Sequence, residues 1–365
     1  MSTSERIFNF GAGPAVLPLS VLQQVQKELL NFNGTGMSIM EISHRSKAYE
    51  AVHNETQSLM KKILNLPDNY HVLFLGGGAS LQFAMVPLNF LGPGEVADYI
   101  VTGSWSEKAL KEAKKIGNTN IAASSEATNF NRIPKKEEFK FSPSPVYVHI
   151  TSNNTIFGTQ WPSLDNICPH PLVADMSSDI LSRPFDATQF SLIYAGAQKN
   201  LGPAGVTVVI VSDEMLAKAK SEKLPTMLKY SIHVENNSLY NTPPVFAIYV
   251  VNLVLKWILD NGGLAAMEKR NREKANVIYE AIDNSGGFYR GHAEKDSRSL
   301  MNVTFNLPNE ELEKKFVAEA KQVGLDGLKG HRSVGGIRAS IYNAMEYEGC
   351  RKLAEFMADF QKKIA

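Results

Sequence analysis

A chain of 365 residues is long for one hydrophobic core, so two domains are expected. Lysine and arginine number 38 against 37 aspartates and glutamates, and this net charge of +1 argues against a nucleic-acid partner bound by broad electrostatics. Two isolated cysteines, Cys168 and Cys350, offer no disulfide framework and no metal-ligand spacing, so no metal is expected. The N-terminus lacks the apolar segment of a signal peptide, which predicts a cytoplasmic protein without a membrane partner.

The first part of the chain alternates helical patterns with short apolar runs. A helix is expected over 46–65, a second helix opens at Leu81, and a third runs from near Trp105 toward Gly117. Residues 118–145 are poorly patterned, and only loops and short strands are expected there. Strands are expected at 71–75, 97–102, 146–151, 171–175, 191–197 and 205–211. Alternating strands and helices predict a parallel sheet covered on both faces.

The pattern changes after residue 255. The most apolar stretch, Val245 to Leu259, is short for a membrane span and is expected to be a buried helix. Beyond it we expect helices at 263–284, 309–323 and 346–363, with strands at 300–306 and 337–341. This mixture predicts a smaller α+β domain. We place a large domain at residues 16–258 and a small domain at 1–15 and 259–365.

Two charged residues stand at strand ends in apolar surroundings. Lys199 follows the run 191–197 just before a turn, where an ammonium group is costly unless it is paired or covalently used. Asp175 ends the run 171–175. A lysine that forms a Schiff base and an aspartate that keeps a proton on the pyridine nitrogen are what a pyridoxal phosphate enzyme needs. Either residue alone could equally be a solvated strand end.

Three further candidates follow other strands. The glycines 76–78 precede Ser80 where a strand gives way to a helix, and such a turn either cradles a phosphate or binds nothing. Trp105 could stack on a planar cofactor or simply pack in the core. Thr155 could contact a ring oxygen or satisfy a turn. Five candidates after five strands share one predicted sheet edge, where ligands of open α/β sheets bind.

A second group of candidates is basic. His44 and Arg45 form one pair near the N-terminus, and His331 and Arg332 form another in a glycine-rich segment that also holds Arg338. Arginine forks match carboxylate and phosphate oxygens bidentately. The two pairs suggest a doubly anionic substrate, although scattered surface charge is the alternative.

With these motifs in place, the chain resembles the phosphoserine aminotransferase family, whose members are fold-type-I pyridoxal phosphate enzymes of the class V aminotransferases. The resemblance runs nearly end to end. Its most diagnostic motifs are Asn9-Phe-Gly-Ala-Gly-Pro14 and Gly330-His-Arg-Ser-Val-Gly-Gly-Ile-Arg338. The remaining motifs are Glu41–Ser46, Phe74–Gly78, Thr102–Trp105, Ala174–Ser178, Tyr194–Asn200 and Asn241–Pro244.

The resemblance implies an α/β fold whose large domain holds a mainly parallel seven-stranded sheet, with a smaller α+β C-terminal domain. It implies reversible transfer of the amino group of L-glutamate to 3-phosphohydroxypyruvate, which gives O-phospho-L-serine and 2-oxoglutarate in serine biosynthesis. The family also acts on the phosphorylated keto acid that leads to 4-phosphohydroxy-L-threonine in vitamin B6 synthesis. A homodimer with shared active sites is implied as well.

The resemblance also implies roles for individual residues. Lys199 would form the Schiff base with pyridoxal 5′-phosphate and shuttle the proton, Asp175 would pair with the pyridinium nitrogen, and Trp105 would stack on the ring. Thr155 would contact the side of the ring that carries the 3-hydroxyl group. The cofactor phosphate would be held by Gly78, Ala79, Ser80 and Gln198, and from the other subunit by Asn241 and Thr242.

On the substrate side, the resemblance implies that Arg338 takes the α-carboxylate. The phosphate of the substrate, or the side-chain carboxylate of glutamate, would be held by His44, Arg45, His331 and Arg332. The chain departs from some members at Ala79-Ser80, where they carry an arginine. Backbone N–H groups and the Ser80 hydroxyl would then supply those contacts.

Two other kinds of function are open at this point. The first is another fold-type-I reaction, such as cysteine desulfuration or alanine–glyoxylate transamination. Cys168 and Cys350 are poorly placed for desulfuration, and the second His–Arg pair favours a phosphorylated substrate over glyoxylate. The second is a catalytically silent scaffold that only binds the cofactor. Intact Lys199, Asp175 and Arg338 argue against it.

Overall fold

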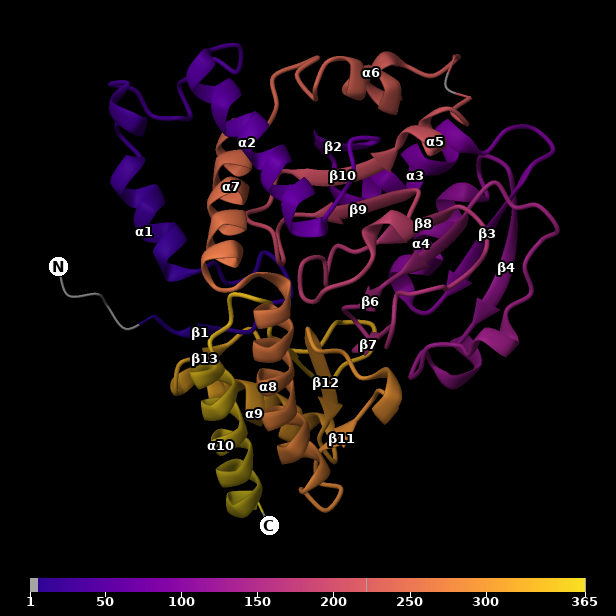
Figure 1. Ribbon diagram of the computed structural model, residues 1–365. Coiled ribbons are helices and arrows are strands. Elements are labelled where there is room, and N and C mark those ends of the chain that lie inside the picture. The colour runs from indigo at the N-terminus through magenta and orange to yellow at the C-terminus, as the bar shows by residue number, and fades with distance from the viewer. Residues whose placement is uncertain (1–5, 221, 365) are drawn as a thin grey trace.

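The computed structural model describes residues 6–220 and 222–364. A seven-stranded sheet lies at the centre of its larger part (Figure 1). Its strand order is β2-β10-β9-β8-β5-β3-β4. Six of the strands run in one direction, and only β10 is antiparallel to its neighbours β2 and β9. The strands are β2 (Tyr70–Leu75), β3 (Val96–Val101), β4 (Asn118–Ser124), β5 (Val148–Thr151), β8 (Leu172–Asp175), β9 (Leu192–Gly196) and β10 (Thr207–Ser212). The expected mainly parallel seven-stranded sheet is confirmed.

Side chains of this sheet alternate between two cores, one on each face. In β2, Phe74 packs into the core on the α2 and α7 side, whereas its neighbours Leu73 and Leu75 pack into the core on the α3 and α4 side. Every residue of β5, β8, β9 and β10 is buried, because helices cover both faces. The covering helices are α1 (Leu19–Glu28), α2 (Lys47–Leu64), α3 (Gly78–Phe90), α4 (Ser104–Ala113) and α7 (Val245–Asp260).

The C-terminal part of the chain forms a third core below the large sheet in Figure 1. Its three-stranded antiparallel sheet has the order β11-β12-β14, with β11 (Arg290–Gly291), β12 (Asn302–Asn306) and β14 (Ile337–Ser340). Helices α8 (Gly263–Asp283), α9 (Glu310–Gln322) and α10 (Tyr347–Ile364) pack with it. The N-terminal strand β1 (Phe8–Asn9) joins this part by pairing in parallel with β13 (Leu325–Asp326). Phe10 is fully buried in the same core.

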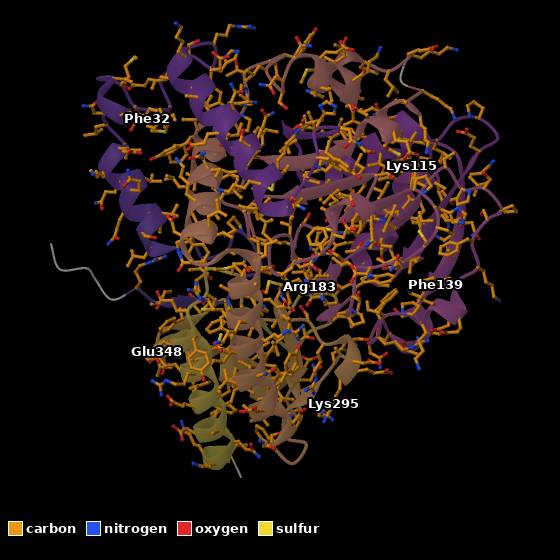
Figure 2. The ribbon with its side chains drawn as sticks, viewed as in Figure 1. Phe32, Lys115, Phe139, Arg183, Lys295 and Glu348 are labelled. Atoms are coloured by element: carbon orange, nitrogen blue, oxygen red, sulfur yellow. The ribbon has the colours of Figure 1, made fainter. Side chains whose placement is uncertain are left out.

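The two parts are joined by buried polar contacts rather than by one clean boundary. Figure 2 labels Arg183 where the upper and lower parts meet. Two residues earlier, the carbonyl oxygen of Leu181 accepts from the Nδ2 atom of Asn343, in the C-terminal part, at 2.8 Å. Asn271 of α8 donates to the carbonyl oxygen of Ser182 at 2.9 Å. Met267 of α8 packs into a core of the large sheet. The division at residues 258 and 259 therefore stays a prediction.

The remaining elements are short. They are β6 (Asn153–Asn154), β7 (Thr159–Gln160), α5 (Asp213–Leu216) and α6 (Tyr230–Glu235). Among the described residues, no single helix is long and apolar enough to cross a membrane, and only the bent pair of α7 and α8 passes jointly by length and composition.

Candidate active site

The carboxyl ends of five strands meet at one cavity of about 140 Å³. Strands β2, β3, β5, β8 and β9 each end at this edge, and the loops that follow them supply the cavity wall. All eight cofactor residues predicted within one chain line it. The wall consists of Gly78, Ala79, Ser80, Trp105, Thr151, Asn153, Thr155, Asp175, Ser177, Ser178, Gln198 and Lys199.

Lys199 projects its amine into this cavity from the turn after β9. Its Nζ atom donates to Thr155 Oγ1 at 2.8 Å and lies 5.9 Å from the centroid of the Trp105 ring. Burial lowers the pKa of Lys199 to about 8, and the negative charge of Asp175 partly opposes this effect. The site therefore holds a lysine that is readily deprotonated and can act as a nucleophile.

Asp175 is held in place by the segment that follows it. Its Oδ1 atom accepts from the backbone N–H of Ser177 at 2.9 Å and from the Ser177 hydroxyl at 2.6 Å. The Ser177 hydroxyl oxygen also accepts from the N–H of Gly196 at 3.1 Å, which ties Asp175 to β9. Burial raises the pKa of Asp175, against the effect of the Ser177 bonds and of the Lys199 charge. Among the described residues every hydrogen bond to the Asp175 carboxylate uses Oδ1, so Oδ2 is available to a ligand.

The glycines after β2 form the opposite wall. Helix α3 begins at Gly78, so the prediction that it opens at Leu81 is wrong by three residues. The apolar periodicity starts at Leu81, and the two preceding left-handed glycines, Gly77 (φ +84°) and Gly78 (φ +64°), carry no such signal. The N–H groups of the first helical turn have no partner within the helix, which suits an anion.

These residues fit pyridoxal phosphate by several independent features. A Cβ atom built on Gly78 would meet no atom within 4 Å, so the helix start opens onto free space. The buried Nε1 atom of Trp105 has no hydrogen-bond partner among the described residues. An amine, a carboxylate with a free oxygen and an aromatic ring thus converge on one cavity beside a helix N-terminus.

A second cavity of about 270 Å³ lies against the small sheet and includes His331 and Arg338. Arg338, on β14, connects the two cavities, because its Nη1 atom donates to the carbonyl oxygen of Thr155 at 3.4 Å. The buried Nε atom of Arg338 has no partner among the described residues. Burial lowers the pKa of His331, and the positive charges of Arg338, Lys108 and Arg332 lower it further. The positive charges around this cavity favour the binding of an anionic group.

Five predicted site residues line neither cavity. Arg332 is exposed at the tip of the loop that carries His331, and His44 and Arg45 precede α2. The Nε2 atom of His44 is buried and has no partner among the described residues. Asn241 and Thr242 are exposed in the loop before α7. Their predicted roles remain predictions.

Sequence reasoning gave no role to Ser177, although its hydroxyl is what fixes Asp175. Its place two residues after Asp175 was the available signal, since a short hydroxyl side chain at that spacing often bonds the preceding carboxylate. Lys108 was also missed. Its Nζ atom lies 4.1 Å from the centroid of the Trp105 ring.

Comparison with known proteins places the chain in a family. The sequence model of the family described as Aminotransferase class-V matches residues 7–353. The phosphoserine aminotransferase of Herpetosiphon aurantiacus is 63% identical over 357 residues, which is 98% of this chain and 99% of the relative. This chain belongs to the phosphoserine aminotransferase family.

Solved structures of the family agree with this assignment. The phosphoserine aminotransferase from Bacillus circulans subsp. alkalophilus is 58% identical, with a TM-score of 0.97 over 99% of this chain and 100% of that one. The pyridoxal phosphate-bound phosphoserine aminotransferase from Trichomonas vaginalis is 40% identical, with a TM-score of 0.92 over 97% of this chain and 100% of that one. The protein is accordingly an aminotransferase with the fold that the resemblance implied.

Proposed function

We propose that this enzyme reversibly transfers the amino group of L-glutamate to 3-phosphohydroxypyruvate, giving 2-oxoglutarate and O-phospho-L-serine. Membership of the family supports the reaction class. The single observation that carries the proposal is the meeting of Lys199 and Arg338 at Thr155, whose hydroxyl accepts from one and whose carbonyl accepts from the other. The proton-transferring amine and the carboxylate-binding guanidinium are thereby held at neighbouring positions.

We propose pyridoxal 5′-phosphate as the cofactor. Lys199 would hold it covalently, Asp175 Oδ2 would accept from its ring N–H, and Trp105 would stack on the ring. The N–H groups of Gly78, Ala79 and Ser80, with Gln198, would hold its phosphate. When bound, the cofactor withdraws electrons from the substrate Cα and so makes the proton there removable.

The residues of this chain then control where protons and charges lie. Arg338 binds the substrate α-carboxylate and orients Cα toward Nζ of Lys199. The Lys199 amine, whose pKa is lowered to about 8, removes the proton from Cα as general base and returns one as general acid. Thr155 Oγ1, at 2.8 Å, orients the amine for both transfers. Because glutamate and the phosphorylated acid use the same site in turn, ping-pong kinetics are expected.

We propose further that the enzyme works as a homodimer in which Asn241 and Thr242 reach the cofactor phosphate of the partner subunit. Both residues are exposed in the single chain. Large apolar side chains between α1 and α2 are exposed as well, with Leu30 at 85% and Met40 at 58%. Such clustered exposure is typical of a surface that is covered by a partner.

Subunit mixing tests this arrangement. Lys199→Ala and a double variant, Asn241→Ala with Thr242→Ala, should each be impaired alone. Their mixed dimer contains one site with both an intact Lys199 and an intact phosphate contact, so activity should return after dissociation and reassociation. No recovery, with mixed dimers demonstrated by mass spectrometry, would contradict shared sites.

The first test of the reaction is the visible absorption spectrum of the holoenzyme before and after addition of O-phospho-L-serine, with L-serine as control. Loss of the visible cofactor band with O-phospho-L-serine only would support the cofactor, the half-reaction and the phosphate preference together. A band that O-phospho-L-serine leaves unchanged would keep the cofactor assignment and overturn the substrate assignment.

A further inference from the structure

Positive charge accumulates beside the two cavities without a matching acid. Arg338 and His331 line the second cavity, Arg332 lies next to His331, and Lys108 projects from α4. The salt bridges among residues 6–220 and 222–364 include none of these four side chains. Like charges that share a small volume repel one another, and an anionic ligand relieves that repulsion.

Of these four residues, Lys108 is the one that has no role in the proposed mechanism. It stands three residues after Trp105 on α4, so both side chains lie on the same helix face. Its ammonium sits 4.1 Å from the centroid of the Trp105 ring, and Lys199 Nζ lies 5.9 Å from the same centroid. Trp105 lines the Lys199 cavity. Lys108 is thus at the rim of the site where the chemistry takes place.

The charge of Lys108 also reaches the second cavity. Burial has the largest effect on the pKa of His331 and lowers it. The positive charges of Arg338, Lys108 and Arg332 lower this pKa further. Lys108 belongs to the part of the molecule with the large sheet, whereas His331, Arg332 and Arg338 belong to the small part. Lys108, over the Trp105 ring, thus adds a positive charge from a different part of the fold to the surroundings of His331.

We propose that Lys108 is a further substrate-binding residue, which contacts the second anionic group of the substrate together with His331 and selects phosphate over carboxylate. A phosphate monoester carries a charge of about −1.5 to −2 near pH 7, whereas a side-chain carboxylate carries −1. A further cation near His331 consequently favours the phosphorylated substrate. This inference rests on the proposed function, because it assumes that both substrates occupy this site.

A purely supporting role for Lys108 makes a different prediction. If its ammonium and methylene chain only held Trp105 in place, loss of Lys108 would weaken every substrate equally, since the ring serves both half-reactions. Lys108→Met keeps an apolar chain over the indole and removes the charge. Lys108→Arg keeps the charge, and Lys111→Met removes an exposed cation one turn further along α4.

The experiment is a titration of each holoenzyme with O-phospho-L-serine and with L-glutamate, followed by the visible absorbance of the cofactor. Lys108→Met should raise the Kd for O-phospho-L-serine about tenfold and that for L-glutamate by no more than about twofold. Lys108→Arg should restore most of the affinity, and Lys111→Met should match the wild type. Equal losses for both ligands, or no loss for either, would overturn the proposal.

A second readout does not depend on turnover. The pKa of His331 can be followed in the holoenzyme by NMR of its ring protons, assigned with His331→Gln. Lys108→Met should raise this pKa, because one neighbouring positive charge is removed while Arg332, Arg338 and the hydrogen bond to Ser333 remain. An unchanged pKa would overturn the placement of Lys108. If wild-type holoenzyme fails to respond to O-phospho-L-serine, the proposed function fails while this measurement still tests Lys108.

Discussion

The Lys199 cavity and the His331 cavity are built in contrasting ways. The first is made from turns that directly follow buried strands, and its key groups are fixed by short contacts such as those from Ser177 to Asp175. The second draws on the small sheet and on a glycine-rich loop that closes on itself, where the N–H of Gly330 donates to the carbonyl oxygen of Gly336. In the proposed mechanism the chemistry takes place at the sheet edge, and the choice of substrate depends on the loop around His331 together with Lys108 of α4.

The strongest way to test this contrast is to remove the amine. Lys199→Ala should lower kcat by at least about a thousandfold, because general base and acid are lost together. The fold should survive, since the one hydrogen bond that Nζ makes within residues 6–220 and 222–364 goes to Thr155. Steady-state kinetics and circular dichroism melting curves measure the two effects. Near-normal turnover in this variant would refute the assignment of the chemistry to the sheet edge.

Arg338 tests the connection between the cavities. Arg338→Ala should lower kcat/KM about a hundredfold for L-glutamate and for 3-phosphohydroxypyruvate alike, because both carry an α-carboxylate. Arg338→Lys keeps the charge but not the two-pronged geometry and should recover only part of the loss. A loss confined to one substrate would show that Arg338 recognises something other than the shared carboxylate.

Arg332 should separate the two substrates. Arg332→Ala should raise the KM for 3-phosphohydroxypyruvate about tenfold and change that for L-glutamate much less, because the phosphate is more highly charged. Arg351→Ala, on the exposed face of α10, is a suitable control. Equal changes for both substrates would show that Arg332 does not recognise the phosphate. They would also weaken the proposed difference in role between the Lys199 cavity and the His331 cavity.

The smallest expected effect is a shift in pH dependence. Protonated Lys199 cannot attack an aldehyde, so uptake of pyridoxal phosphate by cofactor-free protein should accelerate through a midpoint near the Lys199 pKa of about 8, instead of the ordinary 10.5. Asp175 raises this pKa, so Asp175→Asn should move the midpoint downward. Stopped-flow absorbance over a pH series measures it. Asp165→Asn, which removes an exposed carboxylate, is the control and should leave the midpoint unchanged. An unchanged midpoint in Asp175→Asn would show that Asp175 does not influence the pKa of Lys199.

Local patterns predicted most of the sheet edge. Lys199 and Asp175 were found because a charged residue after an apolar run has few ordinary explanations. Only loops and short strands were expected over 118–145, and the edge strand β4 was not placed within them. Its first four residues, 118–121, are exposed or partly buried, and only Ala122 and Ala123 reach a core. Its pairing with β3 also shifts register between Tyr99 and Ile100.

Contacts between distant segments were beyond the reach of such patterns. The pairing of Phe8 with Leu325 joins residues from opposite ends of the chain, and neither two-residue strand has a period of its own. The same holds for Lys108, whose significance depends on a histidine in another part of the fold. Residues assigned to a partner subunit, such as Asn241, came from the family resemblance alone.

Thr155 has a consequence for how such an enzyme can change over generations. Its hydroxyl accepts from Lys199 and its backbone carbonyl accepts from Arg338, so in the proposed mechanism a shift of this residue would disturb proton transfer and carboxylate binding together. Changes in substrate preference should therefore arise from substitutions in the loop around Arg332 or at Lys108. Relatives that prefer a different anionic substrate should therefore keep the same residues in the turn after β5.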